Sequence, residues 1–100
     1  MTQLERITHY EEILDKINAA VSDLDRVLET FDAVQPLVRE LDDYYGSDDW
    51  RQDYADDEAG KLPADLKRGV LSEDGVYDAL TDNRELLVRM LETVVRSMRG

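Results

Sequence analysis

The sequence predicts an all-α protein, a small antiparallel helical bundle with a long N-terminal helix, a kink at Pro36, short helices in the middle and a closing C-terminal helix. Apolar residues recur every three or four positions near both ends of the chain, and no segment shows the strict alternation of a half-buried strand. Glycine, proline and serine interrupt the middle, where short elements and turns are expected. The 100 residues fit a single helical domain, 1–100.

The segment from Leu4 to Val34 is the longest expected helix. Its apolar residues follow the a and d spacing of a heptad at Ile7, Tyr10, Leu14, Ile17, Val21, Leu24, Leu28 and Phe31. A second stripe lies one position before each a site, at Ile13, Ala20, Val27 and Val34. Three apolar positions per heptad make a face wider than a two-stranded seam requires, so we expect this helix to have two neighbours, as in a three-helix bundle.

Pro36 is expected to kink or stop this helix, because it lacks a backbone donor and disfavours helical geometry at Gln35. A second, shorter helix should then run from Leu37 to a C-terminal glycine, Gly46. Ser47 or Asp48 can cap a third helix that ends near Gly60.

The segment 62–69, "LPADLKRG", resembles one or two helical turns stopped by Gly69. Ser72 is a plausible cap for the next segment. Asp82 and Glu85 resemble a capping box, where the last helix either restarts or continues straight through. Its apolar stripe comprises Leu80, Leu87, Met90, Leu91, Val94, Val95 and Met98.

Charge and composition narrow the classes of partner. Acidic residues number 24 and basic residues 12, for a net charge of −12, which disfavours nucleic acid and anionic membranes and favours a basic protein or a cation. The absence of cysteine excludes disulfides, thiol catalysis and thiolate metal sites. No signal peptide or membrane-spanning run is recognised, so we expect a cytoplasmic protein.

The acidic middle is the first candidate site. Eight carboxylates lie between Asp42 and Glu58, against one base, Arg51. Such a cluster suits Ca²⁺ or Mg²⁺, but a calcium loop with Gly60 at its sixth position would place Ala55 at the first, which cannot ligate. We expect a solvated acidic surface, with a divalent-cation site as the alternative.

A second pattern resembles the magnesium-binding motif of the all-α nucleotide pyrophosphohydrolases. It consists of E-E-x-x-D from Glu11 to Asp15 and E-x-x-D from Glu40 to Asp43. The resemblance implies facing helices that present acids to Mg²⁺ and a triphosphate. This chain departs from it at Asp15, where the family has glutamate, and the heptad count places Glu12 and Asp15 on the outer face.

The aromatic residues of the middle form a third candidate site, either anchors for a partner or a structural corner. Lys67 and Arg68 are assigned to a helix end, and the single histidine, His9, lies on the outer face without a triad. We expect no catalytic residue, metal or cofactor. The residues assigned to partner binding or to a structural corner are Tyr44, Tyr45, Trp50, Tyr54, Asp53, Asp57, Glu58, Lys67 and Arg68.

The same middle stretch resembles the signature of a small, uncharacterised bacterial all-helical family, a domain of unknown function marked by YYGS…W…LPxDLKRGVLSED. The matching residues are Tyr44 to Ser47, Trp50, Asp53, Asp57, Glu58, Leu62, Pro63, Asp65 to Asp74, Tyr77 and Leu80. The resemblance implies a helical arm before the motif and a helix after it, and it implies no activity.

The sequence therefore favours a non-enzymatic protein-interaction or structural module. In the interaction reading, Trp50 and Tyr54 are apolar anchors, and the acids around them steer toward a basic protein. The acids of that ring are Asp48, Asp49, Asp53, Asp57 and Glu58. Another copy of the chain is a further candidate partner, because the apolar face near Leu4 to Leu14 extends past the shorter helices. The alternative class is a divalent-cation-binding module or Mg-dependent hydrolase that uses the clustered carboxylates.

Overall fold

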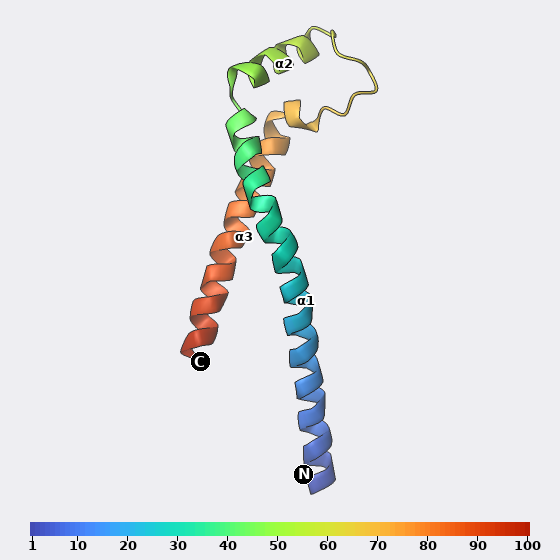
Figure 1. Cartoon of the computed structure of the whole chain (residues 1–100), viewed down its shortest axis with the longest axis vertical. Helices are drawn as coiled ribbons and strands as arrows, with labels where there is room; N and C mark the ends of the chain where they lie inside the picture. Colours follow the sequence, from blue (N-terminus) through green and yellow to red (C-terminus); the bar gives the residue numbers. More distant parts are fainter. The chain divides into compact units, whose positions relative to one another are not determined.

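A computed structural model describes all 100 residues, apart from the side chain of Glu73. The chain contains α1 (Gln3–Tyr44), α2 (Asp48–Glu58), the 3₁₀ helix η1 (Gly69–Leu71) and α3 (Glu73–Arg99) (Figure 1). The backbone described for these residues includes no strand, which confirms the all-α prediction. The chain divides into two units, Met1–Leu37 and Val38–Gly100, and each is described by itself.

The first unit is helical from Gln3 onward, within α1. Thr2 begins the helix with a reciprocal cap: its Oγ1 accepts a hydrogen bond from the Glu5 backbone N–H at 3.2 Å and donates one to Glu5 Oε1 at 3.0 Å. This cap satisfies the backbone N–H of Glu5 and places an acid near the positive end of the helix dipole.

The predicted stop at Pro36 is wrong, because α1 continues through this residue to Tyr44. The proline removes one backbone hydrogen bond, but the chain is helical on both sides of it and the remaining helical hydrogen bonds support each other cooperatively. Just before it, Gln35 Nε2 donates a side-chain hydrogen bond to the Phe31 carbonyl at 3.3 Å. The segment expected as a separate second helix is therefore the last part of α1, while the kink stays a prediction.

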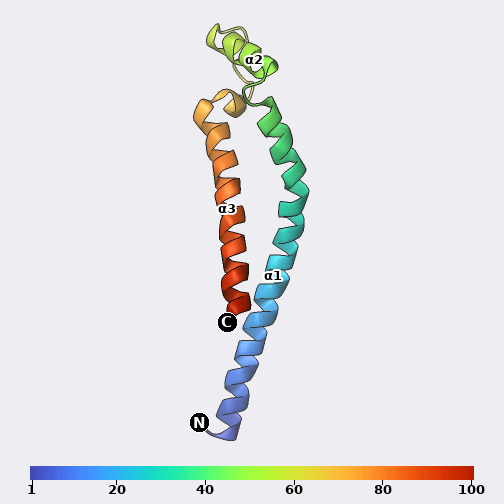
Figure 2. The ribbon, with the colours of Figure 1, turned by 90° about the vertical axis from the view of Figure 1, so that its left-hand side faces the viewer.

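In the second unit, the short helix predicted after Ser47 is confirmed as α2. The predicted helical turns over 62–69 are wrong. One hydrogen-bonded turn forms there, from the Leu66 N–H to the Pro63 carbonyl at 3.2 Å, and Gly69 begins η1 instead of ending a helix. Figure 2 shows α2 and the following loop beside η1, at the start of α3.

The last helix does not restart at Asp82; α3 continues straight through to Arg99. Ser72 caps it as predicted, since its side chain accepts a hydrogen bond from the Gly75 N–H at 3.3 Å. Gly75 allows a close approach, because a Cβ there would lie 3.0 Å from the Gly69 carbonyl oxygen, a tight contact. This contact joins η1 to the first turn of α3.

The buried core of the described residues is small. Leu71 of η1 and Val76 of α3 are the two buried apolar side chains, at 7% and 3% exposure. The apolar stripes of the long helices remain open, and their most exposed members include Leu4, Val21, Leu91 and Met98. The stripes predicted from the sequence therefore lie on helices as expected, but they are not buried.

Candidate functional site

The best-defined group of interacting side chains lies between the end of α1 and the start of α3. We call residues 44–72 the corner. Gly46 leaves α1 with a φ of 80°, a left-handed geometry that glycine adopts without strain. Ser47 then caps α2 by accepting a hydrogen bond from the Trp50 N–H at 3.1 Å. Gly46 has the predicted role, and of the two predicted caps, Ser47 and Asp48, the structure uses Ser47.

Tyr44 connects the end of α1 to α2. Its hydroxyl donates a hydrogen bond to Asp53 Oδ2 at 2.6 Å. That bond to a carboxylate, with partial burial and the negative charges of Asp53 and Asp49, raises the pKa of Tyr44 from 10.0 to about 12. The hydrogen bond between the end of α1 and α2 therefore requires the protonated form of the Tyr44 hydroxyl.

The aromatic residues of the corner stack on one another. The rings of Trp50 and Tyr54 lie 5.3 Å apart in a stacked arrangement, and the Tyr45 ring meets Trp50 edge-on at 5.2 Å. All three residues are half-buried. Trp50 Nε1 also donates a hydrogen bond to the Val70 carbonyl at 2.8 Å, so α2 is fastened to η1.

Arg68 holds the loop between α2 and η1. Its Nη1 pairs with Asp57 Oδ1 at 2.5 Å, and its Nη2 donates to the carbonyls of Pro63 and Ala64 at 3.0 and 3.3 Å. Its Nε donates to the Leu66 carbonyl at 3.4 Å. The guanidinium thus bonds to carbonyl groups of the loop that a helix over 62–69 would have paired with backbone N–H groups.

The remaining predicted site residues do not join this set of interactions. Glu58 and Lys67 are exposed. Asp48, from the predicted acidic ring, forms an exposed ion pair with Arg51 at 2.9 Å within α2. The structure therefore brings together Tyr44, Tyr45, Trp50, Asp53, Tyr54, Asp57 and Arg68, and it leaves Glu58 and Lys67 at the surface.

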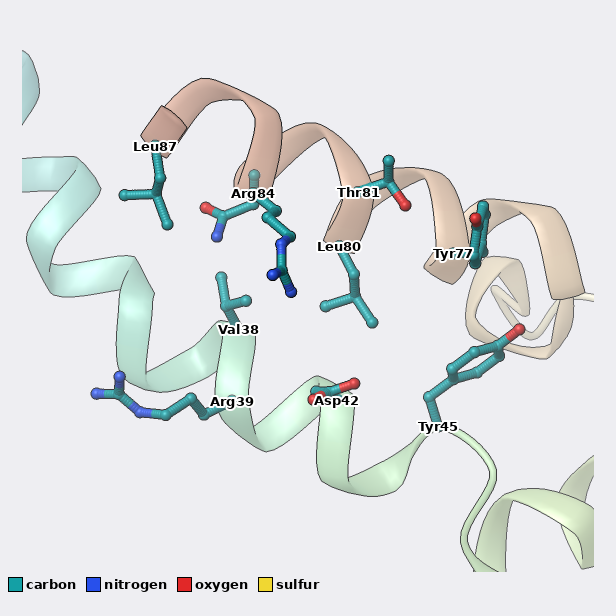
Figure 3. A pocket seen from close by; sticks show the side chains of 10 residues that line it. Val38, Arg39, Asp42, Tyr45, Tyr77, Leu80, Thr81, Arg84 and Leu87 are labelled. Atoms are coloured by element: carbon teal, nitrogen blue, oxygen red, sulfur yellow. The ribbon is translucent and has the colours of Figure 1, made fainter. Parts of the chain in front are cut away.

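The sequence did not point to an open groove of about 410 Å³ between the last turns of α1 and the first half of α3 (Figure 3). Its apolar wall includes Val38, Leu80 and Leu87, and Arg84 extends across it from α3. The whole lining comprises Val38, Arg39, Asp42, Tyr45, Tyr77, Leu80, Thr81, Asn83, Arg84 and Leu87. The sequence feature that relates to this groove is the spacing of Leu80 and Leu87, which places both on one face of a helix. The sequence does not show that this face lies opposite Val38.

The carboxylate patterns do not converge. Among the described residues, no three histidine or carboxylate side chains are grouped closely enough to hold a metal ion. The two motifs that resemble a pyrophosphohydrolase site, at Glu11–Asp15 and Glu40–Asp43, lie on the same helix, α1, whereas that resemblance implies facing helices. Within the part of the chain that the structure describes, no helix is long and apolar enough to cross a membrane.

Comparison with known proteins places the chain in a family without assigning it an activity. A family profile described as a domain of unknown function, DUF4298, matches residues 7–93. No curated protein and no solved structure is significantly similar to the chain. The match extends from the first heptad of α1 nearly to the end of α3, and it includes the whole corner. The chain therefore belongs to the DUF4298 family of domains of unknown function.

Proposed function

We propose that this protein is a non-enzymatic cytoplasmic interaction module, a small antiparallel helical bundle whose long helices present apolar faces to a protein partner. The observation that carries the proposal is the exposure of these faces. On α1, Ile7, Tyr10 and Ile17 are 52%, 60% and 54% exposed, although they share one stripe. Large contiguous apolar surfaces on a protein are typical of interaction sites.

The corner has a structural role in this proposal. Trp50 and Tyr54, the expected partner anchors, stack on each other, and Trp50 is bonded to η1. Asp53 and Asp57, from the expected steering ring, are bonded to Tyr44 and Arg68. These internal bonds favour a lock that fixes the connection from α1 through α2 to α3. The contact surface then lies on the long helices.

The proposal is tested with a pair of neighbouring substitutions on α1. Ile17→Glu places a charge at a d position of the apolar stripe, whereas Lys16→Glu changes charge at a c position, outside the a and d positions. A tagged chain is co-expressed with an untagged copy and recovered from cell extract. We expect a stoichiometric protein, either another copy or a different chain, with the wild type and Lys16→Glu and a loss of it with Ile17→Glu. Recovery of the tagged chain alone in all three cases would contradict the proposal.

The alternative, a divalent-cation-binding module or Mg-dependent hydrolase, predicts a different result. Unfolding of the purified chain is followed through Trp50 fluorescence with Mg²⁺, Mn²⁺ or Ca²⁺ at matched ionic strength. A site filled at 100 times its dissociation constant adds about 2.7 kcal/mol, which moves the midpoint of a domain of this size by more than about 10 °C. We expect no shift beyond that of salt screening, and a shift of this size with one cation would favour the alternative.

A further inference from the structure

We infer that the apolar face of α1 binds the same face of a second copy, as an antiparallel pair related by a two-fold axis that crosses this face at the level of residue 19. This inference rests on the proposed interaction role of the helix and adds the partner, the orientation and the register.

The lengths of the helices show that one chain cannot cover α1 with its own residues. The helix has 42 residues and α3, the next longest, has 27, so 15 residues of α1 have no counterpart in α3, wherever α3 lies. At about 1.5 Å per residue the excess is roughly 22 Å of helix. The 11 residues of α2 belong to the corner, where they are bonded to η1. A partner is therefore needed to cover part of the stripe.

The width of the face leads to the same conclusion. An apolar face with three positions per heptad accommodates two neighbouring helices. Among the described residues α3 is the one other long helix, so at least one of two neighbouring helices must come from elsewhere. The a and d positions of α1 are the part of the face that this helix would cover.

A second copy fits this face because, when two copies of α1 are antiparallel, the a and d side chains of one copy pair with the d and a side chains of the other. In antiparallel order, each a residue meets a d residue of the other copy, and every pair is centred on residue 19. The pairs are Ile7 with Phe31, Tyr10 with Leu28, Leu14 with Leu24, and Ile17 with Val21. All eight positions are apolar, so this register closes a two-fold interface without burying a charge.

The distribution of charge permits this contact between two acidic chains. Most charged residues of the first unit lie at b, c and f positions, away from the seam; examples are Glu12, Lys16, Asp23 and Arg26. Glu11 and Asp25 flank the seam and repel weakly across it, so added salt should strengthen the pair.

The contact area meets the requirement of a specific interface. The a and d side chains from Ile7 to Leu24 are each between 49% and 63% exposed, and Leu28 and Phe31 are half-buried. Covering eight such residues on each copy, with their polar flanks, removes on the order of 1,000 Å² from water. This area is close to the roughly 1,000 Å² that a specific interface should clear.

The absence of cysteine makes a site-directed crosslinking test direct. Ala20 lies beside the seam, next to the proposed axis, whereas its neighbour Ala19 lies on the opposite face of the helix. Each is replaced singly by cysteine in the full chain, and a thiol crosslinker shorter than a helix diameter of about 10–12 Å is added. We expect most of the Ala20→Cys chains, and almost none of the Ala19→Cys chains, to become covalent dimers.

The orientation is tested with a mixture of two variants. Ile13 of one copy meets Val27 of the other only if the helices are antiparallel. Mixed Ile13→Cys and Val27→Cys chains should crosslink to each other, and Ile13→Cys alone should not. Self-crosslinking of Ile13→Cys alone would indicate a parallel pair and overturn the inference. Equal crosslinking of Ala19→Cys and Ala20→Cys would also overturn the inference. The absence of crosslinking, together with a monomeric mass of 11.5 kDa, would overturn it as well. If a different protein is then recovered through the Ile17 face, the proposed function stands while this inference falls.

Discussion

Replacing Arg68 with alanine should loosen the corner and lower the stability of the whole protein. The side chain is 35% exposed and pairs with Asp57, which is 19% exposed, so solvent screens the pair only in part. Hydrogen bonds to charged groups contribute about 1.5–3 kcal/mol each when buried, and exposed pairs contribute well under 1 kcal/mol. The carbonyl of Pro63 would keep its hydrogen bond from the Leu66 N–H, and the carbonyl of Ala64 would lose the Arg68 donor but could bond to water. We therefore expect a loss of about 2 kcal/mol, which corresponds to roughly 8–16 °C in Tm.

The matched control is Lys67→Ala, which removes the same charge from the adjacent residue. Lys67 is exposed, so its replacement should change stability by no more than about 0.5 kcal/mol. Urea unfolding is followed by far-UV circular dichroism and by the fluorescence of Trp50, which is bonded to η1. The fluorescence should report the loss at least as strongly as the dichroism. If the two variants unfold at the same urea concentration, Arg68 does not hold the loop and the proposed structural role of the corner is wrong.

Three further predictions follow from individual residues. Because the hydrogen bond to Asp53 raises the pKa of Tyr44 from 10.0 to about 12, its stabilising contribution is complete below pH 10 and is lost as pH rises to 12. Spectrophotometric titration should show a late tyrosine ionisation that the Tyr44→Phe variant lacks. Gly46→Ala should cost about 1–2 kcal/mol in urea unfolding because φ is 80°, although no atom obstructs the added Cβ, whereas Gly69→Ala, at an open position without a positive φ, should be close to neutral. Pro36→Ala should raise the free energy of unfolding by up to about 3 kcal/mol, and Tm with it, because it restores a backbone donor inside α1. A lower Tm would show that the fold depends on the proline.

Patterns that depend on local chemistry could be predicted from the sequence. The heptad spacing over 4–34 gave the helix that became most of α1, and the positions of Gly46, Ser47 and Ser72 gave the helix ends that the structure contains. Each of these signals acts within about one turn of the chain, where caps and glycine conformations are decided. The family signature around the corner was likewise visible in the sequence, and the family match over residues 7–93 supports it.

Features that depend on long-range contacts could not be predicted. A proline is a local signal for a helix end, yet the helical segments on both sides of Pro36 outweigh it. The segment 62–69 has caps and charges typical of a helix, but the Arg68 side chain takes its carbonyl groups, and this arrangement depends on Asp57 eleven residues away. The groove beside Arg84 needed knowledge of which helices are neighbours.

The most direct test of this account is sedimentation equilibrium of the unmodified chain over a wide range of concentrations. The central claim is that the apolar face of α1 is covered by association, so the mass should rise from 11.5 kDa toward twice that value with increasing concentration. Ile17→Glu should hold the mass at that of the monomer, and Lys16→Glu should leave the association intact. A fully helical protein that remains at 11.5 kDa at every concentration would contradict association with a second copy.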